Sequence, residues 1–124
     1  MAMQMIRHIV LINWKKDASP EQIDNLIRLC NRIPDECSMV YNWCSSRAIP
    51  NREPEKPSTH EFCIMFDIRS AADWDQYFQH PYPKSVLEEG LKIVDADRTA
   101  STNMLVEAEP LRVKSQILAI SVSA

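Results

Sequence analysis

The chain has 124 residues, with 14 basic and 17 acidic side chains and a net charge of −3. This length predicts a single domain, and the absence of a basic patch argues against nucleic acid as a partner, because phosphate binding requires clustered positive charge. No apolar run approaches the length of a membrane span, and the first residues, MAMQMIRH, lack the apolar core of a signal peptide. We therefore predict a cytoplasmic protein that does not bind membranes.

Cysteine and glycine usage narrows the chemistry further. The four cysteines at positions 30, 37, 44 and 63 form no C-x-x-C pair, which favours free thiols; a disulfide or a zinc site has little support. Gly90 is the only glycine, which excludes the glycine-rich phosphate loops of common nucleotide-binding enzymes. Three histidines without a metal-ligand spacing predict no metal, and we expect no cofactor of any kind.

The first third of the chain predicts a strand and a helix. Over residues 5–14 apolar side chains alternate with period two, placing His8 on one face with Ile6, Val10, Ile12 and Trp14. Residues 19–22, SPEQ, combine a capping serine, a proline and a glutamine at the third helical position, which indicates a helix start. Apolar residues then recur with helical spacing until Pro34, where we expect the helix to end.

Two further strands are expected in the middle of the chain. Over residues 38–46, Met39, Tyr41 and Trp43 alternate with Val40, Asn42 and Cys44. A polar loop with three prolines follows over 48–58. The next strand, over 60–68, would place five side chains on one face, namely His60, Phe62, Ile64, Phe66 and Ile68.

The last third predicts two helices and a strand. Ser70 can cap a helix with Trp74, Tyr77 and Phe78 on one side, which the prolines within 80–83 would stop. A second helix is expected over 85–95 and a fourth strand over 99–107. Gly90 lies inside that helix, where we expect close packing to be its reason. We predict a domain over 1–108 and an apolar tail over 109–124 that packs on this domain or on a partner subunit.

The predicted order β-α-β-β-α-β is the α+β arrangement of ferredoxin-like folds, with the first and third strands at the centre of the sheet. Helices cover one face of such a sheet. The other face also carries apolar side chains, namely Ile9, Leu11, Cys63 and Met65. A second copy of the chain would cover them, so we predict a homodimer, a dimeric α+β barrel.

Three stretches carry a family resemblance: IRHIVLINWKKDASPEQI, THEFCIMFDI and WDQYFQHP. Over about residues 5–107 the chain resembles the stress-responsive dimeric α/β-barrel (Dabb) family. The resemblance implies a dimer with a ligand cavity between each sheet and its helices. Among the family are polyketide cyclases of the olivetolic acid cyclase type, which use a histidine and a tyrosine in that cavity; other members are known only as stress-associated proteins.

Carried over residue by residue, the resemblance implies four candidate catalytic residues: His8, His60, Tyr77 and His80. The cyclases' catalytic histidine falls on Pro83, which can neither take nor give a proton. Acid–base work would then pass to His8, His60, Tyr77 or Tyr82. Each has a structural alternative: a satisfied core histidine, a packed tyrosine, or, for His80, a cation at a helix C-terminus.

The chemistry open to this set is proton transfer beside a carbonyl group. A neutral imidazole can take an acidic C–H proton, and a tyrosine hydroxyl can hold the resulting oxyanion. We expect an apolar or aromatic ligand, bound by Tyr41, Trp43, Phe62, Phe66, Trp74, Phe78 and Tyr82. The sequence thus favours a cofactor-independent lyase, cyclase or isomerase for a polyketide-like or aromatic carbonyl compound. The alternative is a non-catalytic dimeric stress-responsive or ligand-binding protein.

Overall fold

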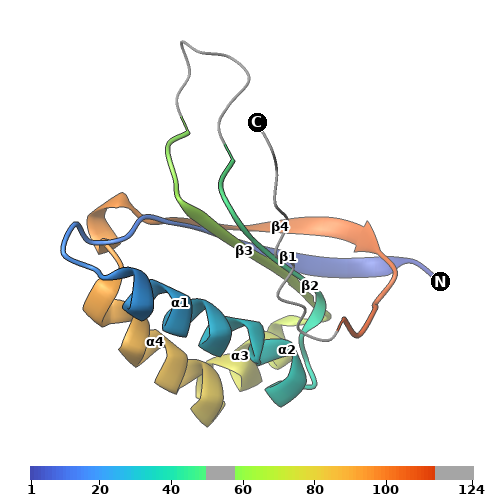
Figure 1. Ribbon diagram of the computed structural model, residues 1–124. Helices are drawn as coiled ribbons and strands as arrows, with labels where there is room; N and C mark the ends of the chain where they lie inside the picture. Colours follow the sequence, from blue (N-terminus) through green and yellow to red (C-terminus); the bar gives the residue numbers. More distant parts are fainter. Residues whose placement is uncertain (50–57, 114–124) are drawn as a thin grey trace.

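A computed structural model describes residues 1–49 and 58–113. One four-stranded antiparallel sheet has the order β2-β3-β1-β4, and the helices all lie on one side of it (Figure 1). This is the predicted α+β, ferredoxin-like fold, with β1 and β3 at its centre. In chain order the elements are β1 (Met3–Ile12), α1 (Pro20–Asn31), α2 (Ile33–Glu36), β2 (Tyr41–Arg47), β3 (Phe62–Ile68), α3 (Ala71–Gln79), α4 (Pro81–Ile93), the 3₁₀ turn η1 (Ala96–Arg98) and β4 (Ala100–Ala108).

The register of β1 decides which side chains share a face. His8 is paired with Phe66 of β3 on one side and with Asn103 of β4 on the other. Directly paired residues point to the same face of an antiparallel sheet, so these three side chains belong together. The neighbouring pairs Ile9–Met65 and Leu11–Cys63 point the other way, as predicted. All four of these side chains are half-buried in the single chain.

Helix α1 begins as its sequence predicts. The Ser19 hydroxyl accepts from the backbone N–H of Gln22 at 3.1 Å, and the Gln22 side chain accepts from the Ser19 N–H at 2.9 Å. The helix ends at Asn31, before Pro34 is reached. Pro34 then lies in the first turn of the short helix α2, where a missing N–H costs no intrahelical bond. It opens a helix and does not close one, which corrects the prediction.

The segment 80–83 ends one helix and begins the next. It ends α3 at Gln79, as predicted, but α4 already begins at Pro81 and not near residue 85. The prolines at 81 and 83 fill first-turn positions that lack an intrahelical partner in any case. His80 caps this turn, because its ring Nδ1 accepts from the Tyr82 N–H at 3.1 Å. His80 is therefore the C-cap residue of α3 and, through its ring, the N-cap of α4.

A β-bulge interrupts β2 between Tyr41 and Cys44. Asn42 has a φ of 55°, a left-handed conformation that non-glycine residues adopt rarely. Asparagine adopts it more often than most of them, and a bulge is a place where it occurs. Tyr41 is consequently paired with Asp67 on the helix-free face, whereas Trp43 is buried in the core under the helices. The predicted alternation placed Tyr41 and Trp43 on one face, which is wrong.

A buried ion pair supports the helix-free face near this bulge. The Asp67 carboxylate is fully buried and accepts from the Arg7 guanidinium at 2.8 and 3.0 Å. The Asn42 side-chain amide donates to the same carboxylate at 2.7 Å. These contacts give the carboxylate three donors, which a buried charge needs to offset its loss of water.

The first residues of the predicted tail contact the domain. Leu111 exchanges hydrogen bonds with Asn42 at 2.8 and 3.0 Å, which adds a short extension to the free edge of β2. The Arg112 guanidinium donates to four backbone carbonyls at 2.7 to 3.0 Å, namely those of Pro34, Cys37, Ser38 and Val40. Residues 114–124 of the tail lie outside the described residues. Within the described ranges, no helix is long and apolar enough to cross a bilayer.

Candidate active site

A cavity of about 370 Å³ lies between the helix-facing side of the sheet and helices α1, α3 and α4. This volume is within the range of small-molecule sites. Its walls are mainly aliphatic and aromatic. The polar residues that line it are His8 of β1, Tyr77 of α3, Lys84 of α4, Thr99 just before β4 and Ser101 of β4.

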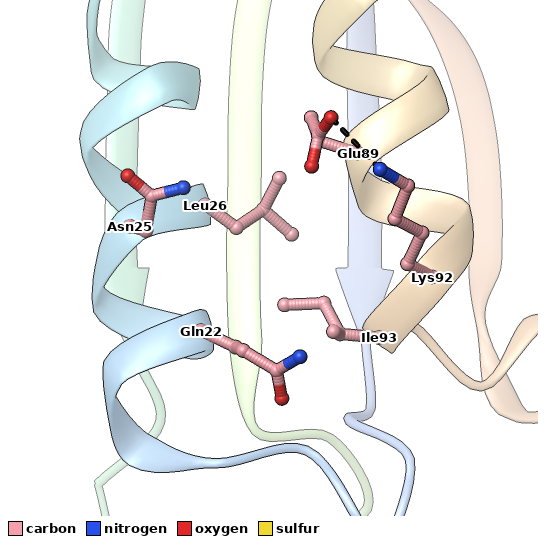
Figure 2. Close-up of a pocket in the computed structure, with 6 residues that line it drawn as sticks. All are labelled: Gln22, Asn25, Leu26, Glu89, Lys92 and Ile93. Atoms are coloured by element: carbon pink, nitrogen blue, oxygen red, sulfur yellow. Dashed lines mark hydrogen bonds and ion pairs between the residues drawn. The ribbon is translucent and has the colours of Figure 1, made fainter.

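A second hollow between α1 and α4 is much smaller, about 60 Å³. Figure 2 shows Leu26 and Ile93 facing each other across it, with the Lys92–Glu89 ion pair of 3.1 Å at its rim. This space would hold one or two water molecules and no candidate catalytic group lines it. The larger cavity is therefore the candidate active site.

His8 is fixed in this cavity by a neighbouring strand. Its Nδ1 lies 2.8 Å from the side-chain oxygen of Asn103 on β4. An amide oxygen can only accept, so the proton is on Nδ1 and the Nε2 lone pair is available. The ring packs 4.7 Å from Trp74 and 5.3 Å from Phe66, centroid to centroid. Burial lowers the pKa of His8 below its usual 6.5, which keeps the imidazole neutral near pH 7.

Tyr77 supplies a hydroxyl to the same cavity. Its ring stacks on Trp74 at 5.6 Å and lies 5.2 Å from Phe66, so both aromatic neighbours of His8 also hold Tyr77. No hydrogen bond of the Tyr77 hydroxyl is found among the described residues. Burial raises the pKa of Tyr77, so the hydroxyl stays protonated and can donate to a ligand.

The remaining reactive groups of the wall are less suited to catalysis. Cys30 is buried there, and burial raises the pKa of its thiol to about 12, which keeps the nucleophilic thiolate from forming. Pro83 is buried in the wall, at the position where the family resemblance implies a catalytic histidine. Among the described residues, no group of three or more histidine, cysteine or acidic side chains converges as metal ligands would.

Four of the predicted site residues line this cavity together: His8, Phe66, Tyr77 and Phe78. Trp74 packs against His8 and Tyr77 and so supports both. Phe78 is 55% exposed and forms part of the cavity's opening.

His60 is placed differently from the prediction. Strand β3 begins only at Phe62, and it is Phe66 that pairs with His8. The six residue steps from His60 to Phe66 correspond to about 20 Å of extended chain. The His60 Nδ1 lies 2.8 Å from the hydroxyl of Thr59, away from the cavity lining. His8 and His60 therefore do not share a site.

Two other predicted residues act in helix packing. The Tyr82 hydroxyl donates to the Leu29 carbonyl of α1 at 2.7 Å, and the Arg32 guanidinium lies 5.7 Å from its ring centroid. His80 caps α4, as described above. Neither side chain lines the cavity.

The predicted aromatic residues of β2 and of the start of β3 also lie elsewhere. Tyr41 lies under the guanidinium of Arg69, 4.5 Å from its ring centroid, on the helix-free side of the sheet. Trp43 is a core residue that donates from Nε1 to the Asn31 side chain at 3.1 Å. Phe62 packs against Trp14 at 5.8 Å and is almost fully buried.

Sequence reasoning missed Asn103 and Lys84. Asn103 is recognisable only once β4 is paired with β1, because the register brings it beside His8. Lys84 faces the cavity because α4 begins at Pro81, earlier than its hydrophobic pattern indicated. The proline pair at 81 and 83 is the signal that could have shown this.

Comparisons with solved structures show several proteins that share the fold of this chain. The fold is shared with a hydroxynitrile lyase from Passiflora edulis, with a TM-score of 0.72 and 18% identity over 82% of this chain and 93% of that one. A dimeric ferredoxin-like protein of unknown function from Thermobifida fusca gives a TM-score of 0.69 and 16% identity, over 83% and 92% of the two chains. A Dabb family protein from Mesorhizobium loti gives 0.59 and 17%, over 88% and 99%.

No curated protein sequence matches the chain. A family model, the stress responsive A/B barrel domain (Dabb), matches residues 6–105, which is most of the sequence. This chain therefore belongs to the Dabb family.

Proposed function

We propose that the protein is a cofactor-independent lyase, cyclase or isomerase that moves a proton beside a carbonyl group of a small, largely apolar substrate. The observation that carries this proposal is the 2.8 Å contact between His8 Nδ1 and the Asn103 side-chain oxygen. It leaves Nε2 as an acceptor on a neutral ring in an apolar cavity, which is what a general base near pH 7 requires.

The reaction would begin with transfer of a substrate proton to His8 Nε2. The electron pair of the broken C–H bond moves toward the neighbouring carbonyl, whose oxygen becomes an enolate oxygen. The Tyr77 hydroxyl donates a hydrogen bond to that oxygen, in a cavity whose walls are mainly apolar. Three outcomes are open to the enolate. Its carbon attacks a second carbonyl of the substrate, or a leaving group departs from the neighbouring carbon, or a proton is added at a different carbon. His8 returns its proton in the last step, so the enzyme is regenerated.

The cavity supports a polyketide-like or aromatic carbonyl compound as substrate. Its walls are formed by aliphatic side chains and by Phe66 and Phe78, which offer contact area for rings or acyl chains. The similarity to a lyase from Passiflora edulis shows the fold, and that protein's name shows that this fold can carry lyase chemistry.

Replacing Tyr77 by phenylalanine tests the proposal. We expect a loss of about a hundredfold or more in turnover, because a donor to the developing oxyanion is removed. The measurements are cyclisation of a linear tetraketide and, independently of any one substrate, deuterium exchange beside the carbonyl of an aromatic ketone followed by NMR. Tyr82→Phe is the matched control, since that hydroxyl bonds the Leu29 carbonyl outside the cavity. Equal activity of the two variants would refute a catalytic role for Tyr77.

A second candidate function is non-catalytic ligand binding. Pro83 favours it, because this residue is buried in the cavity wall where the family's polyketide cyclases have an imidazole. Pro83→His separates the two. Gain of tetraketide cyclisation would indicate a cavity already shaped for that chemistry. No gain, together with an unaffected Tyr77→Phe variant, would leave ligand binding as the function.

We also propose that the protein acts as a homodimer. Solved proteins of this fold are described as dimeric, including the one from Thermobifida fusca and a further one from Bacteroides fragilis. The half-buried apolar pairs Ile9–Met65 and Leu11–Cys63 on the helix-free side of the sheet are the surface that a partner would cover.

A further inference from the structure

Lys84 gives the cavity a positive charge without a counter-ion. It is the one charged side chain among the described residues that line the cavity, since His8 is neutral there. Its ammonium makes no ion pair or hydrogen bond with any described residue. Lys84 is exposed and also lines the cavity, so its charged end can stay in water while its aliphatic stem covers apolar surface at the edge of the cavity. The site therefore favours a ligand with a negative group.

The backbone at this end of α4 offers the ligand nothing more. Pro81 and Pro83 have no N–H, the Tyr82 N–H is bonded to His80 Nδ1, and the Lys84 N–H is bonded to the His80 carbonyl. Phosphate groups are usually bound by several free N–H donors at a helix N-terminus. With those donors absent or occupied, one ammonium group suits a single carboxylate better than a phosphate.

The charge lies toward the same end of the cavity as His8. Val94, just after α4, pairs with Trp14, just after β1, so the helix and the strand are aligned at that end. From there, residues 84–94 span about 15 Å of helix, and residues 8–14 span about 20 Å of strand. Lys84 and His8 therefore both belong to the end of the cavity that is remote from the Trp14–Val94 bridge.

The rest of the cavity suits an apolar chain. Leu87 and Leu91 follow Lys84 along one side of α4, at i+3 and i+7, and line the cavity although they are 63% and 58% exposed. Ile12, Leu26 and Val94 line its far end. A chain lying along this helix face would cover leucine side chains that are otherwise in contact with water, which stabilises the complex.

We propose that the cavity binds an unbranched aliphatic carboxylate, with the carboxylate at Lys84 and the chain extending toward Val94. Because Lys84 and His8 lie at the same end, the carbons close to the carboxylate would be those within reach of His8 and Tyr77. Resting on the proposed function, this assigns the substrate as a keto acid that reacts near its carboxyl end.

Calorimetric titration of the full chain with decanoate and with 1-decanol tests the assignment. We expect decanoate to bind more tightly than decanol, and Lys84→Met to lower decanoate affinity by about tenfold or more while leaving decanol affinity unchanged. Lys92→Met is the matched control, because Lys92 lies on the same helix outside the cavity, paired with Glu89; it should bind decanoate as the wild type does. A thermal melt of each variant checks that the fold is intact.

Equal decanoate affinity of the wild type and Lys84→Met would overturn the proposal, as would wild-type binding of decanol as tight as that of decanoate. Loss of affinity in both lysine variants would also overturn it, because the effect would then be one of general charge. These measurements do not depend on turnover. Lysine-dependent binding by a protein without activity would refute the proposed function and leave the carboxylate site standing.

Discussion

At the scale of single residues, the site depends on one asparagine. The Asn103 oxygen beside His8 decides which ring nitrogen carries the proton, and the same contact partly offsets the lowering of the His8 pKa by burial. Without it, Nδ1 and Nε2 would compete for the proton and the ring would be free to turn. Asn103 is thus a positioning residue for the proposed base.

Replacing Asn103 by alanine should change the pH profile in a definite direction. The catalytic form of His8 is neutral, so activity should rise with pH through a pKa below 6.5. Loss of the Asn103 contact removes the influence that raises this pKa, so the acidic limb should move to lower pH while the plateau rate falls. NMR titration of the His8 ring and the pH dependence of turnover measure both effects.

The matched control is Thr102→Ala, because Thr102 precedes Asn103 on β4 but is paired with Ile9 on the opposite face. Its profile should be that of the wild type. A lower rate in Asn103→Ala with an unmoved acidic limb would contradict the positioning role and indicate a merely structural one. The stability of the fold gives a second check on the pKa of His8. Because this pKa is lower in the folded than in the unfolded state, the contribution of the neutral ring to the free energy of unfolding is fully present above about pH 6.5. It is lost as the pH falls toward the folded-state pKa.

At the scale of elements, strand alternation and capping residues were informative because both are local. The two faces of β1 and β3 follow from period two, and the Ser19 and Ser70 caps follow from the side chain and the next turn. The bulge at Tyr41 was not recognisable, because it shifts the alternation by one residue where no glycine or proline marks it. The helix starts at Pro34 and Pro81 were misread because a proline can follow the end of one helix and can equally lie in the first turn of the next.

Helix α4 contains a position where sequence reasoning and structure lead to different expectations. Close packing was the expected reason for Gly90, yet a methyl group added there would lie 3.9 Å from Leu26, an ordinary contact. Gly90 also lines the cavity. Its absent side chain therefore enlarges the site and is not required by helix packing.

Gly90→Ala should accordingly stabilise the protein by about 0.5–1 kcal/mol, because alanine loses less conformational freedom than glycine in a helix. Urea unfolding monitored by circular dichroism measures this. Gly90→Leu should be at most mildly destabilised. It should bind the ligand more weakly, because its side chain enters the cavity. A destabilised Gly90→Ala protein would show that the helices pack more tightly at this point than the 3.9 Å contact indicates.

At the scale of the whole molecule, the position of the cavity could be predicted, but not all of the residues that form it. Its position between the sheet and the helices follows from the fold, and His8, Phe66 and Tyr77 follow from their faces. His60 was assigned to it because period two was extended beyond the start of β3, where the chain has left the sheet. Asn103 and Lys84 depend on strand register and on where α4 begins, and both are set by tertiary contacts rather than by local pattern.

The helix-free face of the sheet gives the last prediction. Leu11 and Cys63 are paired directly on it, beside the pair Ile9–Met65, and the four side chains form an apolar surface on the two central strands. Such a surface on a proposed dimer would be covered by its counterpart, so a lysine there would have to be buried without a partner or stay in water. Leu11→Lys should therefore give a monomer or an insoluble chain, whereas the wild type should sediment as a dimer.

Leu87→Lys is the matched control, because Leu87 is 63% exposed on α4, on the opposite side of the sheet (Figure 1). That variant should remain dimeric. Sedimentation velocity at micromolar concentration distinguishes the outcomes, and circular dichroism shows whether a monomeric Leu11→Lys chain is folded. A wild type that is a stable monomer under these conditions would refute the homodimer. A dimer lost in Leu87→Lys but kept in Leu11→Lys would instead place the contact on the helices.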